Sequence, residues 1–290
     1  MRFAEIGQQL RAYRMESGLR AEEIAARLGV SRAALYRYEK GEVIKLDTVK
    51  RLAELLKVSP LSLLGIGIEY YSRPPGYFER IRQIEESADQ ILQAADPVCY
   101  LTTSDQFDSA LSEGLTAAAA QSGADKASAQ VTVEQVLTLL AARKRSYQQR
   151  KPGIIALISA SSVRAFLAHG ITPGANLPVA IQERSRAVAA SELERIAAQM
   201  ETEPMGLQFG LLTAAEPTSG FVILRGRDRA TVAVNPFRAD SVPLRQTGVA
   251  MITGADEAVA AHQRLAESLW RDALRGPAAA TALRGMIAGA

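Results

Sequence analysis

Residues 18–42, with the sequence GLRAEEIAARLGVSRAALYRYEKGE, predict two short helices joined by a tight turn. The apolar residues of AEEIAARL recur at helical spacing and form the inner face of the first helix. Gly29 ends this helix, because glycine inside a helix costs about 1 kcal/mol. Ser31 is a favourable N-cap, so we expect the second helix to begin at Arg32 and to end at Gly41.

The second helix has an inward and an outward side. Leu35 and Tyr38, three positions apart, can pack against the first helix. At about 100° per residue, four other side chains share one outward arc of about 140°, namely Arg32, Ala33, Tyr36 and Arg37. Its arginines can bridge the N7 and O6 acceptors of guanine in the major groove of DNA. We favour this contact over the alternative, in which the arginines are solvated surface residues, whereas Tyr36 can equally contact the groove or pack over the helix.

Further helices flank this pair. Ile6, Leu10 and Tyr13 predict a helix that closes at Gly18. The apolar positions of LDTVKRLAELL predict another helix over residues 46–56. The N-terminal region is therefore expected to be a small all-helical domain.

The stretch 18–42 resembles the Cro/CI, or xenobiotic-response-element, branch of helix-turn-helix transcriptional regulators. Residues 61–64, within SPLSLL, resemble the closing fifth helix of that domain. The resemblance covers about a quarter of the chain. It implies an all-α, five-helix, lambda-repressor-like DNA-binding domain over residues 1–70, with a double-stranded DNA operator as its partner.

The resemblance also implies roles for individual residues. The DNA-binding residues would lie on a recognition helix over residues 31–40, and they are Ser31, Arg32, Ala33, Tyr36, Arg37 and Lys40. Arg14 would pair with Glu39 and hold this helix against the first one, while Lys40 and Gly41 would approach a phosphate. The sequence departs from the family pattern at Ala21, where glutamine is common. This departure affects one phosphate-positioning contact and not the fold.

Composition indicates a globular protein. The chain has 290 residues, 48% hydrophobic and 22% charged, enough for one large or two ordinary domains. Residues 1–75 hold 13 basic and nine acidic side chains against 21 and 22 in the remainder, so the basic excess lies where DNA phosphates are expected. Apolar runs fall far short of the ~18 residues of a membrane span, and the N-terminus lacks a secretory apolar core. We expect a cytoplasmic protein without membrane contact.

Cysteine and histidine usage argues against a metal site. The single cysteine, Cys99, excludes an intrachain disulfide framework. We interpret it as a buried small apolar residue rather than a redox sensor. His169 and His262 are widely separated and provide no metal-ligand cluster. No metal and no cofactor are expected.

A boundary is predicted at residues 71–76, YSRPPG. Their turn residues and the Pro-Pro pair favour a short, stiff, extended linker. From residue 77 to about 95, apolar positions at spacings of three and four predict an amphipathic helix of about five turns. This helix can pack on its own domain or pair with its copy in a second chain. Residues 77–290 would then form the regulatory, ligand-sensing and dimerisation domain.

Residues 77–290 alternate between strand-like and helix-like segments. PVCYLTT (97–103) and KPGIIALIS (151–159) predict strands, each followed by a helix, capped by Ser104 and Ser161 respectively. Residues 121–130 predict a polar loop, and 131–150 predict a helix with a basic end. Four later strands and two closing helices are predicted over residues 205–213, 220–226, 230–236, 248–253, 255–275 and 278–287. The expected fold class is a mixed α/β domain with a partly parallel sheet.

Catalytic patterns are missing from this region of the sequence. Some repressors of this class carry a self-cleaving protease domain with a Ser-Lys dyad, which needs a lysine in the C-terminal region. No lysine follows Lys151 in this sequence. The turn segments PGAN and TSGF therefore lack the required base. A phospholipase-type nuclease needs a lysine two positions after histidine, where this chain has Ile171 and Arg264. The basic run ARKRSYQQRK (142–151) could bind nucleic acid, but we favour complementation of a helix dipole. The arginines of ILRGRDR and NPFRAD could bind an anionic effector or lie in solvated turns.

These patterns predict a repressor-type transcriptional regulator that is not an enzyme. Operators are read as two half-sites ~34 to 36 Å apart, so we expect a homodimer. The C-terminal domain would hold a small-molecule effector. Two alternatives stay open. An antitoxin-like DNA-binding protein would mask a partner protein in a stable complex, and a DNA-tethered enzyme would need a convergent set of catalytic groups.

Overall fold

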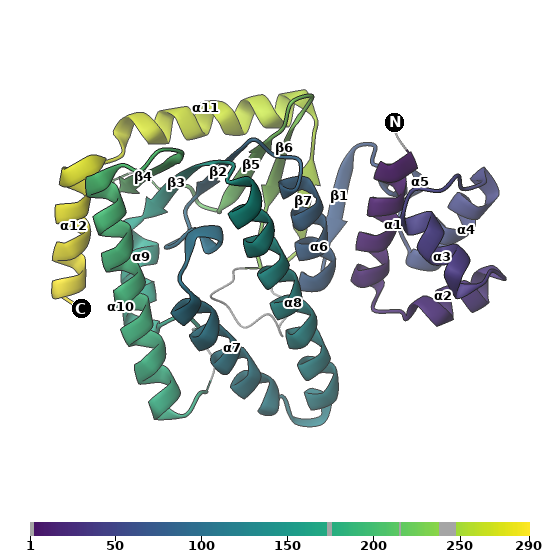
Figure 1. The fold of residues 1–290 in the computed structure, drawn as a ribbon, viewed down its shortest axis with the longest axis horizontal. Helices are drawn as coiled ribbons and strands as arrows, with labels where there is room; N and C mark the ends of the chain where they lie inside the picture. Colours follow the sequence, from purple (N-terminus) through teal and green to yellow (C-terminus); the bar gives the residue numbers. More distant parts are fainter. Residues whose placement is uncertain (1–2, 173–175, 215, 238–247) are drawn as a thin grey trace.

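The computed structural model describes residues 3–172, 176–214, 216–237 and 248–290. A small helical part and a larger α/β part lie side by side (Figure 1). Within these described ranges, no helix is both long enough and apolar enough to cross a membrane.

The described N-terminal part contains five helices, as predicted. They are α1 (Phe3–Ser17), α2 (Ala21–Leu28), α3 (Arg32–Glu39), α4 (Leu46–Leu56) and α5 (Pro60–Leu63). Their apolar faces meet in one core, in which Leu10, Ile24, Leu35 and Leu52 are fully buried. Burying a leucine or isoleucine side chain contributes about 1.5–3 kcal/mol, so this core holds the short helices together.

The described strands of the α/β part form one seven-stranded sheet, in the order β1-β7-β6-β5-β2-β3-β4. The strands are β1 (Ile68–Tyr71), β2 (Gln90–Ala94), β3 (Gly153–Ser159), β4 (Leu207–Leu212), β5 (Phe221–Arg225), β6 (Ala230–Val234) and β7 (Ala250–Thr253). β2, β3 and β4 are parallel, and the remaining neighbours are antiparallel. The predicted partly parallel sheet is confirmed.

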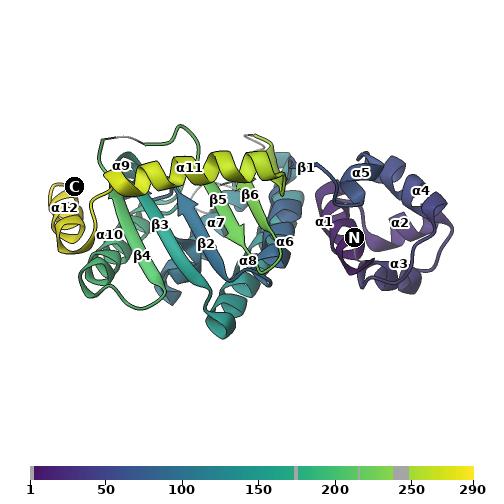
Figure 2. The same cartoon turned by 90° about the horizontal axis from the view of Figure 1, so that it is seen from above.

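Helices cover both faces of the sheet. They are α6 (Pro74–Glu85), α7 (Asp105–Ala120), α8 (Lys126–Arg150), α9 (Ala160–His169), α10 (Val179–Thr202), α11 (Asp256–Asp272) and α12 (Gly276–Ala288). α11 crosses one face (Figure 2), where Ala266 and Leu269 pack against the sheet. On the other face, α6 packs against α8, and α7 packs against α8 and α10. Two short 3-10 turns, Tyr100–Thr102 and Gly123–Asp125, precede Ser104 and α8.

The predicted extended spacer over residues 71–76 is wrong. Tyr71 ends β1, and Pro74 begins α6, where proline fits because the first helical N–H groups need no intrahelical partner. The predicted helix over 77–95 is also too long, since α6 ends at Glu85 and β2 follows. β2 pairs with β3 on one side and with β5 on the other, so tertiary pairing overrides the helical spacing of its residues.

Three smaller predictions also fail. Residues 97–103 form no strand, because the hydroxyls of Thr102 and Thr103 bond to carbonyls three residues earlier and stabilise a 3-10 turn. The predicted loop 121–130 ends early, since α8 begins at Lys126. Ser159 rather than Ser161 caps α9, because β3 runs directly into this helix. The strand β1 and the helix α10 were not predicted from the sequence.

Candidate nucleic-acid interface

The turn before α3 has the predicted geometry. Gly29 lies in the left-handed region with a φ of 70°, where other residues are strained, and it closes α2. The N–H of Val30 donates to the carbonyl of Ala25 at 3.0 Å. Ser31 Oγ then accepts a hydrogen bond from the N–H of Ala34 at 3.1 Å, so the predicted N-cap is confirmed.

α3 keeps the predicted DNA-binding side chains accessible. Leu35 is fully buried and fixes the rotation of the helix about its axis. Ser31, Arg32, Ala33, Arg37 and Lys40 are exposed, and Tyr36 is half-buried. All six candidates lie on α3 or at its two caps.

Each of the two arginines on this exposed side of α3 forms a solvent-exposed ion pair with a glutamate. Arg32 Nη1 lies 2.7 Å from the Glu22 carboxylate, and Arg32 Nη2 donates to Tyr36 Oη at 3.3 Å. That hydrogen bond and the charge of Glu22 raise the pKa of Arg32. Arg37 Nε lies 3.3 Å from the Glu42 carboxylate. Such exposed ion pairs are weak and screened by salt, so DNA phosphates or bases can replace the glutamates.

The predicted pair of Arg14 and Glu39 joins α1 to the end of α3. Arg14 Nε and Nη2 donate to the two carboxylate oxygens at 2.5 and 3.1 Å. The Glu39 side chain is only 5% exposed. Burial would lower the pKa of Arg14, but the hydrogen bond and charge of Glu39 outweigh burial and raise it. This bidentate geometry fixes α3 relative to α1.

Close contact between α1 and α3 depends on Gly7. A Cβ at this position would lie 2.5 Å from the carbonyl oxygen of Tyr38 and 2.6 Å from that of Glu39. Both contacts are with backbone atoms, which cannot rotate away. Glycine therefore lets α1 reach the C-terminal end of α3.

Comparisons with known proteins agree with this geometry. Residues 5–63, which span α1 to α5, match the family described as a helix-turn-helix domain, and the N-terminal part of this chain is therefore a helix-turn-helix domain. The chain is also 33% identical over 121 residues to a protein of Pyrococcus horikoshii that carries the provisional name HTH-type transcriptional regulatory protein. The match covers 38% of each of the two chains. The Cro/CI branch stays a prediction.

The structure adds a junction that sequence reasoning missed. α1 packs along α6, and between them lie polar side chains with little exposure. Glu69 of β1 accepts from Gln9 Nε2 at 2.6 Å, from Tyr71 Oη at 2.7 Å and from Arg80 Nε at 2.8 Å. Glu79, which is fully buried, pairs with Arg11 at 2.8 Å. No periodicity marks these residues, because charged side chains ordinarily lie in solvent.

The basic run 142–151 lies at the end of α8, and part of it is buried. Arg143 makes a bidentate ion pair with Glu85, and Lys144 Nζ lies 2.6 Å from the Asp108 carboxylate. The Lys144 side chain is 7% exposed. The structural interpretation of these two residues is therefore supported, although buried ion pairs replace the expected dipole interaction.

The other candidate groups are separate from one another. Arg225 contacts Gln263, and Arg229 lies 3.7 Å from the carboxylate of Glu5 in α1. Arg238 of NPFRAD and residues 173–175 of PGAN lie outside the described residues. His262 Nδ1 lies 2.8 Å from the carbonyl of Ala258. Within the described ranges, no three His, Cys, Asp or Glu side chains are grouped to hold a metal.

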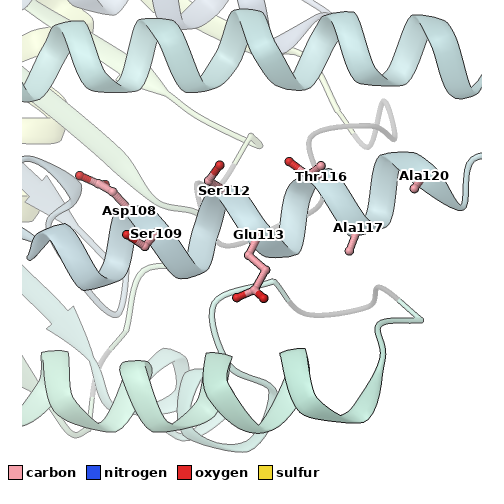
Figure 3. A pocket seen from close by; sticks show the side chains of 7 residues that line it. All are labelled: Asp108, Ser109, Ser112, Glu113, Thr116, Ala117 and Ala120. Carbon is pink, nitrogen blue, oxygen red and sulfur yellow. The ribbon is translucent and has the colours of Figure 1, made fainter.

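A wide hollow of about 690 Å³ follows α7 (Figure 3). The described residues that line it all belong to this helix, and they are Asp108, Ser109, Ser112, Glu113, Thr116, Ala117 and Ala120. Asp108 is bound to Lys144, and Glu113 lies 3.5 Å from Arg184. Because the described residues that line this hollow belong to one element, they provide no convergent set of ligand-binding atoms.

Proposed function

We propose that this protein is a sequence-specific, double-stranded DNA-binding transcriptional regulator of the cytoplasm, without enzymatic activity. The exposed surface of α3 carries this proposal. Arg32 and Arg37 offer forked donors for base edges, and Lys40 offers a charge for a phosphate. Arg14 and Gly7 hold this surface in one orientation from behind. The name of the Pyrococcus horikoshii relative supports the same function.

The regulator acts as a homodimer in this proposal. One helix-turn-helix domain makes few contacts, and two copies at fixed spacing bind two half-sites with much higher combined affinity. Full-length protein should therefore protect a two-part site in footprinting on genomic DNA. Binding a single half-site as tightly as a full site would contradict the dimer.

A small-molecule effector bound in the α/β part controls DNA binding in this proposal. The contact of α1 with α6 supports it. A shift of α6 would displace α1, and α1 is bonded to α3 through Arg14 and Glu39. A coupling of about 1 to 3 kcal/mol is typical of such linkage.

The decisive experiment compares genomic fragments selected by wild-type protein, Arg37→Ala and Arg271→Ala. Arg271 is an exposed arginine in the last turn of α11, a helix that lies in the α/β part and away from α3 (Figure 1). It controls for the loss of one positive charge. Wild type and Arg271→Ala should enrich the same motif, whereas Arg37→Ala should lose it. Enrichment of no motif by wild type would overturn the proposed function.

A further inference from the structure

One face of the sheet is covered along only part of its width. On this face, Val232 of β6 packs in one apolar cluster with Ala266 and Leu269 of α11. α11 contacts β4, β5 and β6, while β1 lies beyond its end (Figure 2). Residues opposite each other on antiparallel strands share a face, and Val232 pairs with Thr253, which pairs with Ile68. The surface beneath α11 therefore continues over β7 and β1.

The side chains that β1 and β7 present on this face are apolar. Ile68, Tyr70 and Met251 are each between 39 and 52% exposed. So is Val249, which lies two positions before Met251 and therefore on the same face. Tyr70 and Met251 are cross-strand partners, so their side chains adjoin. A sheet with one face in water ordinarily presents polar residues there. Apolar residues at these positions indicate that another molecule covers this face in the functional protein.

The same apolar surface extends to the helix-turn-helix domain. After α5, the N–H of Ile66 donates to the carbonyl of Leu61 at 2.9 Å, and the N–H of Gly65 donates to that of Ser62 at 3.0 Å. This way of ending a helix commonly brings the side chains of its outer pair, Leu61 and Ile66, together. Both are exposed, and Ile66 lies two residues before Ile68. We call the whole surface the apolar stripe, and it consists of Leu61, Ile66, Ile68, Tyr70, Val249 and Met251.

We propose that the apolar stripe binds the same stripe of a second copy of this chain, with a twofold axis between the two. The six side chains expose on the order of 500 Å², which is the size of the largest apolar patch on a typical monomer. Two copies would bury about 1,000 Å² of apolar surface, because a twofold contact uses the same patch on both chains. Since about 65% of a homodimer interface is apolar, the whole interface would cover about 1,500 Å², which is enough for a stable dimer.

Dimerisation through the stripe positions both helix-turn-helix domains, a role that rests on the homodimer of the proposed function. β1 presents Ile68 and Tyr70 to the stripe, while Glu69 on its other face accepts from Gln9 Nε2 of α1 at 2.6 Å. Leu61 of α5 brings the helix-turn-helix domain itself into the contact. One four-residue strand therefore joins the second copy to α1. The two recognition surfaces are held about one axis, as the reading of two half-sites requires.

Sedimentation equilibrium of the full chain measures the dimer directly. Wild type should dimerise at micromolar concentration. Tyr70→Lys places a charge in the stripe and should raise the dimer dissociation constant at least about tenfold, as expected for an aromatic residue within an interface. Val131→Lys, in α8, is the matched control. Val131 is as exposed as Tyr70 but lies outside the stripe, so this variant should dimerise as wild type does.

A second variant separates lost association from lost folding. Tyr70→Thr removes the ring but retains a residue that favours strands, and it should weaken the dimer as well. Both variants should keep the far-UV circular dichroism spectrum of wild type, because half of the Tyr70 side chain already lies in solvent. On DNA, Tyr70→Lys should bind a single half-site as wild type does and lose the gain in affinity that two half-sites provide.

The outcomes separate the interface from the proposed function. A monomeric wild type would exclude a second copy as the occupant of the stripe. A dimer that Tyr70→Lys leaves unchanged, or that Val131→Lys weakens equally, would place the interface elsewhere. If the stripe variants dissociate but wild type selects no DNA motif, the interface stands and the proposed function fails. If wild type selects a motif as a monomer, the DNA-binding function stands and the interface fails.

Discussion

Glu16 Oε2, near the end of α1, accepts a hydrogen bond from the backbone N–H of Arg73 at 3.0 Å. Its other oxygen accepts from the N–H and the hydroxyl of Ser72 at 2.6 and 2.7 Å. A carboxylate from the helix-turn-helix domain therefore caps the N-terminus of α6, where negative charge is favourable. The end of α1 therefore directly contacts the start of α6, and α1 is bonded to α3 through Arg14 and Glu39.

Loss of this cap should loosen the junction. Glu16→Ala should lower the free energy of unfolding by about 1–2 kcal/mol, as for other lost N-caps, and should broaden the urea transition because the domains no longer unfold together. Glu54→Ala, an exposed glutamate of α4, is the control and should remain within about 0.5 kcal/mol of wild type. A sharp transition at the wild-type midpoint for Glu16→Ala would show that the cap contributes nothing.

Base reading should depend on Arg37. Arg37→Ala should cost about 1 to 3 kcal/mol of binding on the preferred operator and relax discrimination at one base pair. Lys40→Ala should instead weaken all sequences alike and reduce the salt dependence of binding. Fluorescence anisotropy on matched and mutated operators measures both effects. Unchanged affinity and preference in Arg37→Ala would place the groove contact elsewhere.

The Arg14 and Glu39 pair should be a stabilising contact in the full chain. Arg14→Ala leaves the carboxylate of Glu39, 5% exposed, without its partner, and should cost about 3 kcal/mol at neutral pH. Arg14→Lys keeps the charge but loses the fork, and it should recover part of the loss. Urea denaturation provides the measurement. Equal stabilities for wild type and Arg14→Ala would mean that solvent replaces the arginine.

Gly7→Ala should separate α1 from α3. The added methyl meets two carbonyl oxygens closer than 3.0 Å, and such overpacking typically costs about 1–3 kcal/mol. Operator affinity should fall as well, because α3 must shift. Gly285→Ala is the matched control in α12, where a Cβ meets no atom within 4 Å and helix propensity improves. A melting temperature for Gly7→Ala equal to that of wild type would be the contradicting result.

Cys99 should be inert in the native protein. Burial raises the pKa of the Cys99 thiol from its ordinary value of 9.0 to about 12. At pH 8 only about one native thiol in ten thousand is ionised, so iodoacetamide should react only after unfolding. The thiol pKa is higher in the folded state than in the unfolded state, so the folded state holds the thiol proton more tightly. The thiol's contribution to the free energy of unfolding is therefore fully present below pH 9 and is lost as the pH rises toward 12. Fast alkylation of the native chain at pH 8 would contradict this burial.

The helix-turn-helix domain was predictable because its determinants are local. Gly29 and Ser31 act within one turn of their own backbone, and Leu35 follows a helical period that needs no distant partner. The exposed arginines follow from the same period. For this domain the sequence pattern and the structure agree from α1 to α5.

Only the tertiary structure decided how the two parts join. Residues 90–94 fit a helical spacing and also a strand, and pairing with β3 and β5 selects the strand. Pro74 is compatible with an extended spacer or with the first turn of a helix, and Glu16, 58 positions earlier, favours the helix by capping it. The buried pair of Glu69 and Arg80 likewise depends on neighbours from other elements. Burial and pairing over long separations leave no periodic signal, because each depends on which distant residues the fold brings together.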